Sequence, residues 1–189
     1  MTSSSELKRV LRRLKPHQRT RPLARRPDEA LPFARSSAQP PRQLVLDTTV
    51  YIDQIQHRFP DELDDLLRKC GLWHSAVAVA ELALALGRLD PNHPASPTAT
   101  RQITVVIARV PSHRILNPSA GTWREAAIAS GLLVRLQGYA AARTHDLLND
   151  ALIYFDARKH GRTVLTRNIA DFDLLQQLAP DGQVLFYRI

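Results

Sequence analysis

The chain has 189 residues, of which 44% are hydrophobic, and this content suits one domain with an adequate core plus a tail. No run of 18 apolar residues and no secretory signal is present, so we expect a cytoplasmic protein that neither is secreted nor spans a membrane. The single cysteine, Cys70, excludes an internal disulfide and a zinc site built from several cysteines.

The formal net charge of +8 lies at one end of the chain. Residues 1–42 hold 11 of the 26 Lys and Arg and 3 of the 18 Asp and Glu, which is +8, so the other 147 residues are neutral. Six prolines stand among these arginines, and we expect a basic, largely disordered tail in which only residues 7–14 are helical. Three interpretations compete: disorder without a role, an organellar transit peptide, and an arm that attracts nucleic acid, which we favour slightly.

Residues 43–189 show strand patterns alternating with helix patterns. Strands are predicted at 43–46, 72–75, 113–116, 163–166 and 183–187, and helices at 50–56, 60–68, 75–89, 99–108, 119–137 and 147–160, with one more opening at Asp171. We expect Trp123 to be a core residue of its amphipathic helix. The alternation predicts an α/β three-layer sandwich with a central, mostly parallel sheet.

Four carboxylates stand out by their positions. Asp47 ends the first strand, and Glu81 is the one charge in an apolar helix, between Ser75 and Gly87. Asp150 is expected in the first turn of a helix, on a face shared with apolar residues, and Asp171 follows a later strand. Each could instead be an ordinary helix cap or a paired surface acid. In a parallel α/β sheet, however, all four would meet at the carboxyl edge, where ligands bind.

Carboxylates that share one cleft repel each other unless a cation neutralises them. Oxygen ligands favour Mg²⁺ or Mn²⁺, which also contact substrate phosphates. The chemistry that such a site serves is hydrolysis of a phosphodiester by a metal-activated water.

Four segments together resemble a known family: LVLDTTVYID, AVAELALAL, LLNDALIYFDARKHG and VLTRNIADFDLL. They match in order the signature of PIN-domain nucleases, especially the VapC-type toxins of bacterial toxin–antitoxin pairs, over residues 43–189. The resemblance implies a PIN-like fold and a metal-dependent endoribonuclease that cleaves RNA. It also implies a homodimer that is neutralised by a cognate antitoxin.

The resemblance also assigns roles to residues. Thr166 would orient the metal-bound water, Asn168 would hold its loop, and Asp173 is a weaker candidate for a second metal. Thr49 stands where many relatives carry Asn or Ser, and the basic tail has no counterpart in compact relatives. The metal ligands would be Asp47, Glu81, Asp150 and Asp171.

Other functions remain as alternatives. A housekeeping RNA-processing nuclease would share every motif, and a catalytically idle RNA-binding module would keep the fold while losing acids. A haloacid-dehalogenase-type phosphatase needs a second Asp where Thr49 stands. A nucleotide enzyme would need a glycine-rich loop, and a serine hydrolase a G-x-S-x-G motif, neither of which occurs.

Overall fold

Five parallel strands form the centre of the molecule. The computed structural model describes residues 3–36 and 41–189. Neighbouring strands in the order β3-β2-β1-β4-β5 all pair in parallel, which confirms the expected parallel sheet. The strands are β1 (Gln43–Leu46), β2 (Gly71–Ser75), β3 (Ile115–Leu116), β4 (Thr163–Thr166) and β5 (Gln183–Phe186).

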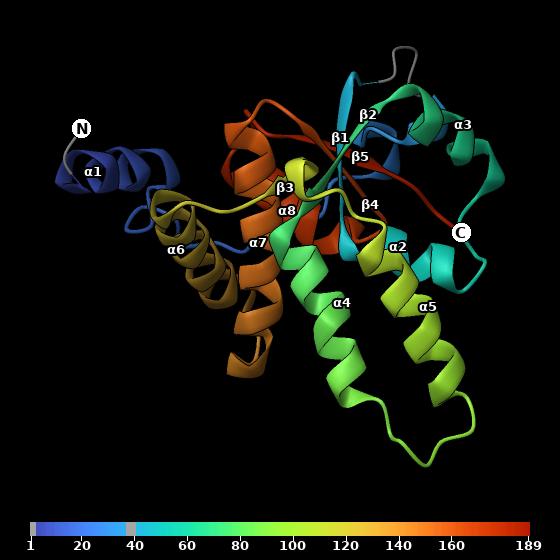
Figure 1. Ribbon diagram of the computed structural model, residues 1–189. Coiled ribbons are helices and arrows are strands. Elements are labelled where there is room, and N and C mark those ends of the chain that lie inside the picture. The colour runs from blue at the N-terminus through green and yellow to red at the C-terminus, as the bar shows by residue number, and fades with distance from the viewer. Residues whose placement is uncertain (1–2, 37–40) are drawn as a thin grey trace.

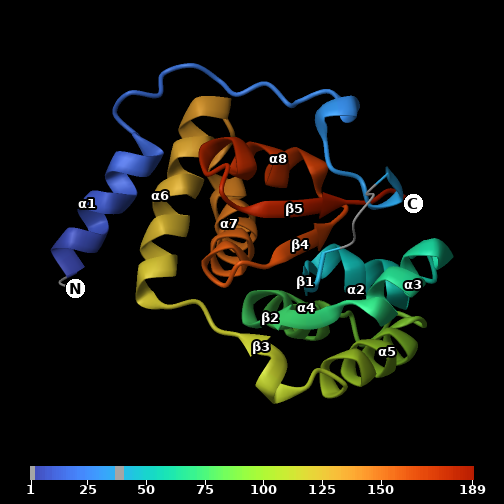
Figure 2. The same ribbon diagram turned by 90° about the horizontal axis from the view of Figure 1, so that it is seen from above.

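Helices cover both faces of this sheet, as the three-layer prediction required (Figures 1 and 2). One face carries α2 (Thr48–Ile55), α3 (Asp61–Lys69), α4 (Ala76–Arg88) and α5 (Ser96–Ala108). The other carries α6 (Ala120–Gln137), α7 (Thr144–Lys159) and α8 (Ile169–Leu178). Short 3-10 turns are η1 (Asp28–Ala30), η2 (Ala34–Ser36), η3 (Ser112–Arg114) and η4 (Ala141–Arg143).

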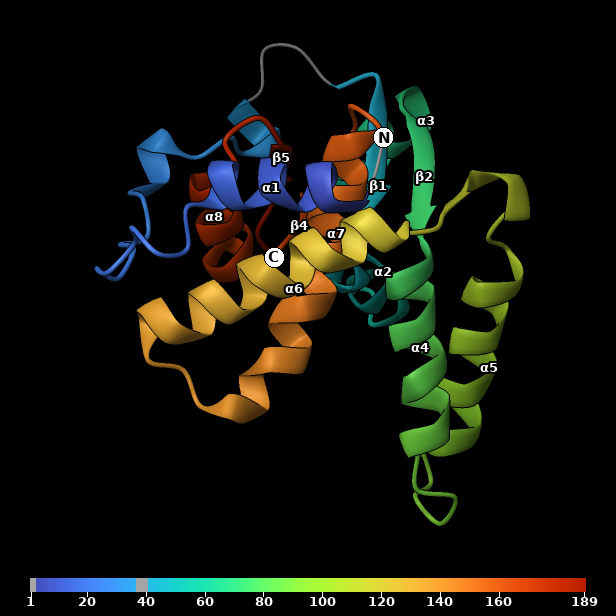
Figure 3. The same ribbon diagram turned by 90° about the vertical axis from the view of Figure 1, so that its left-hand side faces the viewer.

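The central strands are buried because both of their faces are covered. All four residues of β4 are buried, and so are Leu44, Val45 and Leu46 of β1. Continuous apolar runs of this kind are typical of strands between two helical layers. The helices α4 and α5 continue beyond the sheet as an antiparallel pair (Figures 1 and 3), so α4 and the start of α7 enclose the space below the carboxyl ends of the strands.

Two expectations about helices were wrong. Helix α7 begins at Thr144, so Asp150 lies in its second turn and not its first, and the residues from Ala151 to Ala157 are all buried. Trp123 is 48% exposed, because α6 turns its alanine and leucine face toward α7 and leaves the indole on the solvent side. Within the described residues, no helix is both long and apolar enough to cross a lipid bilayer.

The basic tail differs from the expected disorder. Helix α1 (Ser3–Leu14) packs on the outer side of α6 and buries Val10 and Leu14 (Figure 3). Arg13 pairs with the buried Glu125 of α6, and Arg26 pairs with Asp173 of α8 at 2.6 Å. The physical reason lies in the domain: its buried carboxylate Asp173 takes its cationic partner from the tail, and Glu125 pairs with the tail as well as with Arg158 of α7.

The tail then crosses the open edge of the sheet. Phe33 forms an isolated parallel bridge with Phe186, and the Phe186 amide donates to the Pro32 carbonyl at 2.8 Å. Leu31 is buried beside this bridge. The tail therefore covers the end of β5, which would otherwise be an exposed edge strand.

Candidate active site

A cleft of about 810 Å³ lies at the carboxyl edge of the sheet, between α4 and α7. Its walls come from the β1–α2 junction, from α4 and α7, and from the start of α8. We call it the acidic cleft, because its lining includes all four carboxylates singled out in the sequence: Asp47, Glu81, Asp150 and Asp171.

Asp47 is held on the sheet by hydroxyl groups. Its Oδ2 accepts from Thr49 Oγ1 and from Thr166 Oγ1, both at 2.7 Å, and from the Thr49 amide at the start of α2. The side chain is therefore a helix cap as well as a cleft residue. Only 2% of Asp47 is exposed, and this burial raises the pKa of its carboxyl despite the hydrogen bonds.

Thr166 contacts Asp47 and the loop after β4, and its implied role of orienting a metal-bound water stays a prediction. Its hydroxyl has a single hydrogen, which it donates to Asp47, while its oxygen accepts from the Asn168 amide at 2.9 Å. Thr166 therefore orients the Asp47 carboxylate and the loop that follows β4. Thr49, the departure from the family pattern, also binds Asp47 and accepts from the Arg167 amide at 3.1 Å.

Glu81 points from α4 into the cleft. It accepts a hydrogen bond from the Thr48 hydroxyl and another from the Asn149 amide at 2.8 Å. Burial raises the pKa of the Glu81 carboxyl, and repulsion from Asp47 adds to this effect. The prediction that this glutamate points into the fold is confirmed.

Asp150 is the carboxylate of the cleft whose ionised form is most disfavoured by its surroundings. Its pKa is raised well above the ordinary value, first by burial and then by repulsion from Asp47, Asp171 and Glu81. Its Oδ2 accepts from Asn168 Nδ2 at 2.9 Å. A carboxylate in this position favours protonation or a bound cation.

Asn168 joins two of the acids. It caps α8 by accepting from the Asp171 amide at 3.3 Å, and its own side-chain amide donates to Asp150 and to Asp171 Oδ2 at 3.0 Å. The role implied by the resemblance, holding the loop, agrees with these contacts.

Arg143 is a cleft residue that the sequence analysis missed. Its Nη2 donates to both oxygens of Asp171, at 2.8 and 2.9 Å, and its guanidinium lies 5.0 Å from the centre of the Tyr139 ring. The sequence places it in a small-residue loop, where nothing indicates its partner 28 residues away. The chain thus binds one carboxylate of its acidic cleft with its own arginine.

Asp53 was also missed, although it stands inside LVLDTTVYID. It is fully buried, and it accepts from Arg167 Nε at 2.7 Å and from the Tyr187 hydroxyl at 2.8 Å. Arg58 lies at 3.4 Å on its other oxygen. Its position six residues after Asp47 was the one signal in the sequence that could have identified it. Through these contacts Asp53 connects α2 to the ends of β4 and β5.

Asp173 does not lie in the acidic cleft, and this corrects its assignment as a candidate ligand of a second metal. Its fully buried carboxylate accepts from the side chain and amide of Arg26, and from Gln177. Asp173 follows Asp171 by two residues, and residues i and i+2 point to nearly opposite sides of a helix. Asp173 therefore faces the tail and binds Arg26.

The donor set of the cleft fits a hard divalent cation, since it offers carboxylate, hydroxyl and amide oxygens without a thiolate. Residues 3–36 and 41–189 contain no group of three acidic, histidine or cysteine side chains already placed to hold a metal ion. Amides of Asn149 and Asn168 and the Arg143 guanidinium bind the carboxylates instead. The residues of the cleft therefore include oxygen ligands and negative charge that suit a metal ion. In this structure, hydrogen bonds from the protein occupy the oxygens of these carboxylates.

No protein-family model matches the chain, and no curated protein matches its sequence. Solved structures do match. VapBC2 of Rickettsia felis, bound to a promoter DNA fragment, is 18% identical with a TM-score of 0.53, over 77% of this chain and 99% of that chain. FitAcB of Neisseria gonorrhoeae and VapBC-1 of nontypeable Haemophilus influenzae are each 20% identical with TM-scores of 0.53, over 76% of this chain and 96% and 97% of theirs.

These likenesses establish the fold: the chain has the PIN-domain architecture of the VapC components in such complexes. The matched share of 75–78% is close to the size of residues 43–189, which are 147 of 189 residues. The comparison therefore leaves unmatched a part of the chain about as long as the basic tail.

Proposed function

We propose that the chain is a Mg²⁺- or Mn²⁺-dependent endoribonuclease and the toxin of a toxin–antitoxin pair. One observation carries the proposal: four carboxylates from four separate elements line one cleft, where burial and then repulsion from the other three raise the pKa of Asp150. A fold has no structural need for such repulsion, whereas a metal site does.

The chain's own residues would position the reaction. Asp47, Glu81, Asp150 and Asp171 would hold the metal, which when bound would neutralise phosphate charge and supply an acidic water. Thr49 and Thr166 fix Asp47, and Asn168 fixes the start of α8 between Asp150 and Asp171. Because these groups sit on rigid strand and helix ends, substrate phosphate would meet a preorganised site.

A cognate antitoxin is the partner that fits the cleft. The similar solved structures include VapBC toxin–antitoxin proteins, and several of the similar structures are bound to DNA. The contact between Arg143 and Asp171 shows that a cleft carboxylate can bind a guanidinium through both of its oxygens. This supports an arginine of the antitoxin as the inhibiting side chain. RNA as substrate and a homodimer as the working form belong to the same proposal.

The decisive experiment compares two substitutions in one helix. Asp150→Asn should lower Mn²⁺-dependent cleavage of single-stranded RNA about a hundredfold or more, as loss of a key charge-stabilising group typically does. Asp156→Asn is the matched control, because Asp156 is buried in the same helix with a raised pKa and lies outside the cleft. It should cleave RNA at the wild-type rate.

Metal binding to the purified protein, measured by titration calorimetry, gives a second readout. Asp150→Asn should weaken Mn²⁺ binding while Asp156→Asn leaves it unchanged. Full metal-dependent cleavage by Asp150→Asn would overturn the assignment of the four acids. Harmless expression of active protein without any small copurifying partner would favour the housekeeping nuclease.

A further inference from the structure

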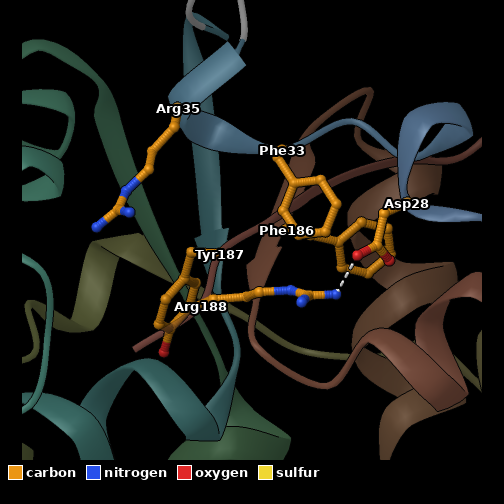
Figure 4. A pocket seen from close by; sticks show the side chains of 6 residues that line it. All are labelled: Asp28, Phe33, Arg35, Phe186, Tyr187 and Arg188. Carbon is orange, nitrogen blue, oxygen red and sulfur yellow. Dashed lines mark hydrogen bonds and ion pairs between the residues drawn. The ribbon is translucent and has the colours of Figure 1, made fainter.

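A second hollow, of about 320 Å³, lies where the tail crosses the carboxyl end of β5 (Figure 4). We call it the aromatic pocket. Three of its residues come from the tail and three from the end of β5 and the residues after it: Asp28, Phe33, Arg35, Phe186, Tyr187 and Arg188.

The walls of the aromatic pocket are held by contacts on several sides. The Phe33 ring packs against Phe186 with centroids 6.2 Å apart, and the Arg188 guanidinium lies 5.3 Å from the Phe33 centroid. Arg188 also donates to Asp28 at 2.5 Å, as the dashed line in Figure 4 shows. An aromatic ring and a planar guanidinium are thus fixed beside an open space. Arg35 also lines this space, but its guanidinium points away from Phe33 and pairs with Glu62 of α3 at 3.0 Å.

The aromatic pocket and the acidic cleft share one edge of the sheet. The Tyr187 amide donates to the Thr166 carbonyl at 3.1 Å, so the pocket begins beside the residue that orients Asp47. Strand β5 is two positions from β1, which is about 10 Å at the usual spacing of about 4.8 Å. Arg167, bound to Asp53, lies at the end of the strand between them.

The charges of the two sites are opposite. Five acids and two arginines line the acidic cleft, a formal charge of −3, whereas two arginines and one acid line the aromatic pocket, a formal charge of +1. Asp53 between the two sites carries two arginines, Arg58 and Arg167, which adds +1. Beyond Arg88 and Arg143 of the cleft itself, a polyanion would therefore find further positive contacts toward the pocket.

We propose that the aromatic pocket binds one nucleobase of a single-stranded RNA whose backbone passes Arg167 into the acidic cleft. The inference rests on the proposed function and adds to it a base-binding subsite that the tail completes. Stacking on the Phe33 ring and the Arg188 guanidinium supplies the affinity, and it tolerates any base because every base has a π-face. The Arg167 guanidinium, which is 35% exposed beside Asp53, faces the phosphate on the side of the acidic cleft.

Three substitutions at one position test the stacking. The probe is a short fluorescein-labelled single-stranded oligoribonucleotide, and its anisotropy is followed in EDTA so that no cleavage occurs. Phe33→Leu keeps an apolar contact with Phe186 and removes the ring, and Phe33→Ala removes both; each should bind about tenfold more weakly. Phe33→Trp should bind at least as tightly as wild type. Trp123→Ala, which truncates an exposed aromatic of α6 outside both sites, is the matched control and should bind as wild type does.

An oligonucleotide with one abasic position, moved along the strand, locates the bound base. Wild type should lose about tenfold in affinity at one position only, and Phe33→Leu should lose nothing further there, because the stack is already absent. Equal loss at every position, or the same loss in both proteins, would overturn the subsite.

The outcomes separate the two proposals. Wild type that binds and cleaves RNA while every Phe33 variant binds equally well refutes the aromatic pocket alone. That result would instead favour a protein partner as the ligand of the aromatic pocket. Wild type that neither binds nor cleaves RNA refutes the proposed function, and the subsite falls with it.

Discussion

The docking of the tail can be tested at Arg26. This residue joins the tail to α8: its Nε donates to Asp173 at 2.6 Å, its amide donates to the same carboxylate at 2.9 Å, and its Nη2 donates to Gln176. The change Arg26→Ala removes the side-chain contacts and leaves the carboxylate buried.

The magnitude follows from the exposure of the two partners. Removing one partner of a fully buried pair costs about 3–5 kcal/mol, and an exposed pair is worth about 0–1 kcal/mol. The Asp173 side chain is fully buried, but 34% of the Arg26 side chain is exposed, and the Arg26 amide and Gln177 still donate to Asp173 after the change. We therefore expect Arg26→Ala to lower the free energy of unfolding by about 2 kcal/mol, which corresponds to a fall of about 4–8 °C in Tm for a chain of this length.

Arg25→Ala is the matched control. It removes the same charge from the neighbouring position, but Arg25 pairs with Asp28 at the surface, where the two side chains are 45% and 41% exposed. Its effect should stay below about 0.5 kcal/mol. The assay is thermal unfolding followed by circular dichroism, with limited proteolysis of the tail beside it. Equally small shifts in both variants would refute the docking and return the tail to the expected disorder.

Three further predictions concern charge. Burial and neighbouring acids raise the folded pKa of Asp150 above its unfolded value, so metal-free protein should lose stability as pH rises from about 4 through the raised pKa; denaturant titrations should show that Asp150→Asn flattens this loss and is more stable at neutral pH. Arg143→Gln should tighten Mn²⁺ binding roughly fivefold to tenfold by calorimetry, because it removes a cation from Asp171; equal affinity would mean that Arg143 leaves at no cost. Deleting residues 1–42 should flatten the salt dependence of RNA binding by roughly 0.7 per phosphate released, and an unchanged slope would show that the tail is not a nucleic-acid arm.

Local patterns predicted the parts of the site that depend on strand and helix ends. Asp47 and Asp171 were placed correctly at the sheet edge because a buried strand followed by an acid defines that edge in a parallel fold. Glu81 was identified because an isolated charge in an apolar helix requires polar surroundings, which Thr48 and Asn149 supply.

Partner choice over long separations could not be predicted. Arg143 binds Asp171 across 28 residues, and Arg26 binds Asp173 across 147, so no local signal distinguishes these arginines from their solvated neighbours. The tail was expected to be disordered because it lacks a core of its own, yet it packs on a core supplied by the domain. The prediction that Trp123 is a core residue was wrong for a related reason. Helix α6 has apolar residues on more than one side, and only its contact with α7 decides which side is buried.

The partners of the tail come last in the order of synthesis. Arg26 precedes Asp173 by 147 residues, and Asp28 precedes Arg188 by 160. At about 5–20 residues per second, the ribosome needs roughly 7–30 s to make the chain between them. During this interval Arg26 lacks its carboxylate partner, Asp28 lacks Arg188, and the longest loops of the fold are still open. The nascent chain therefore holds a basic tail that is not yet docked on α8 and β5 beside ribosomal RNA, and this exposure ends only when these two elements leave the exit tunnel.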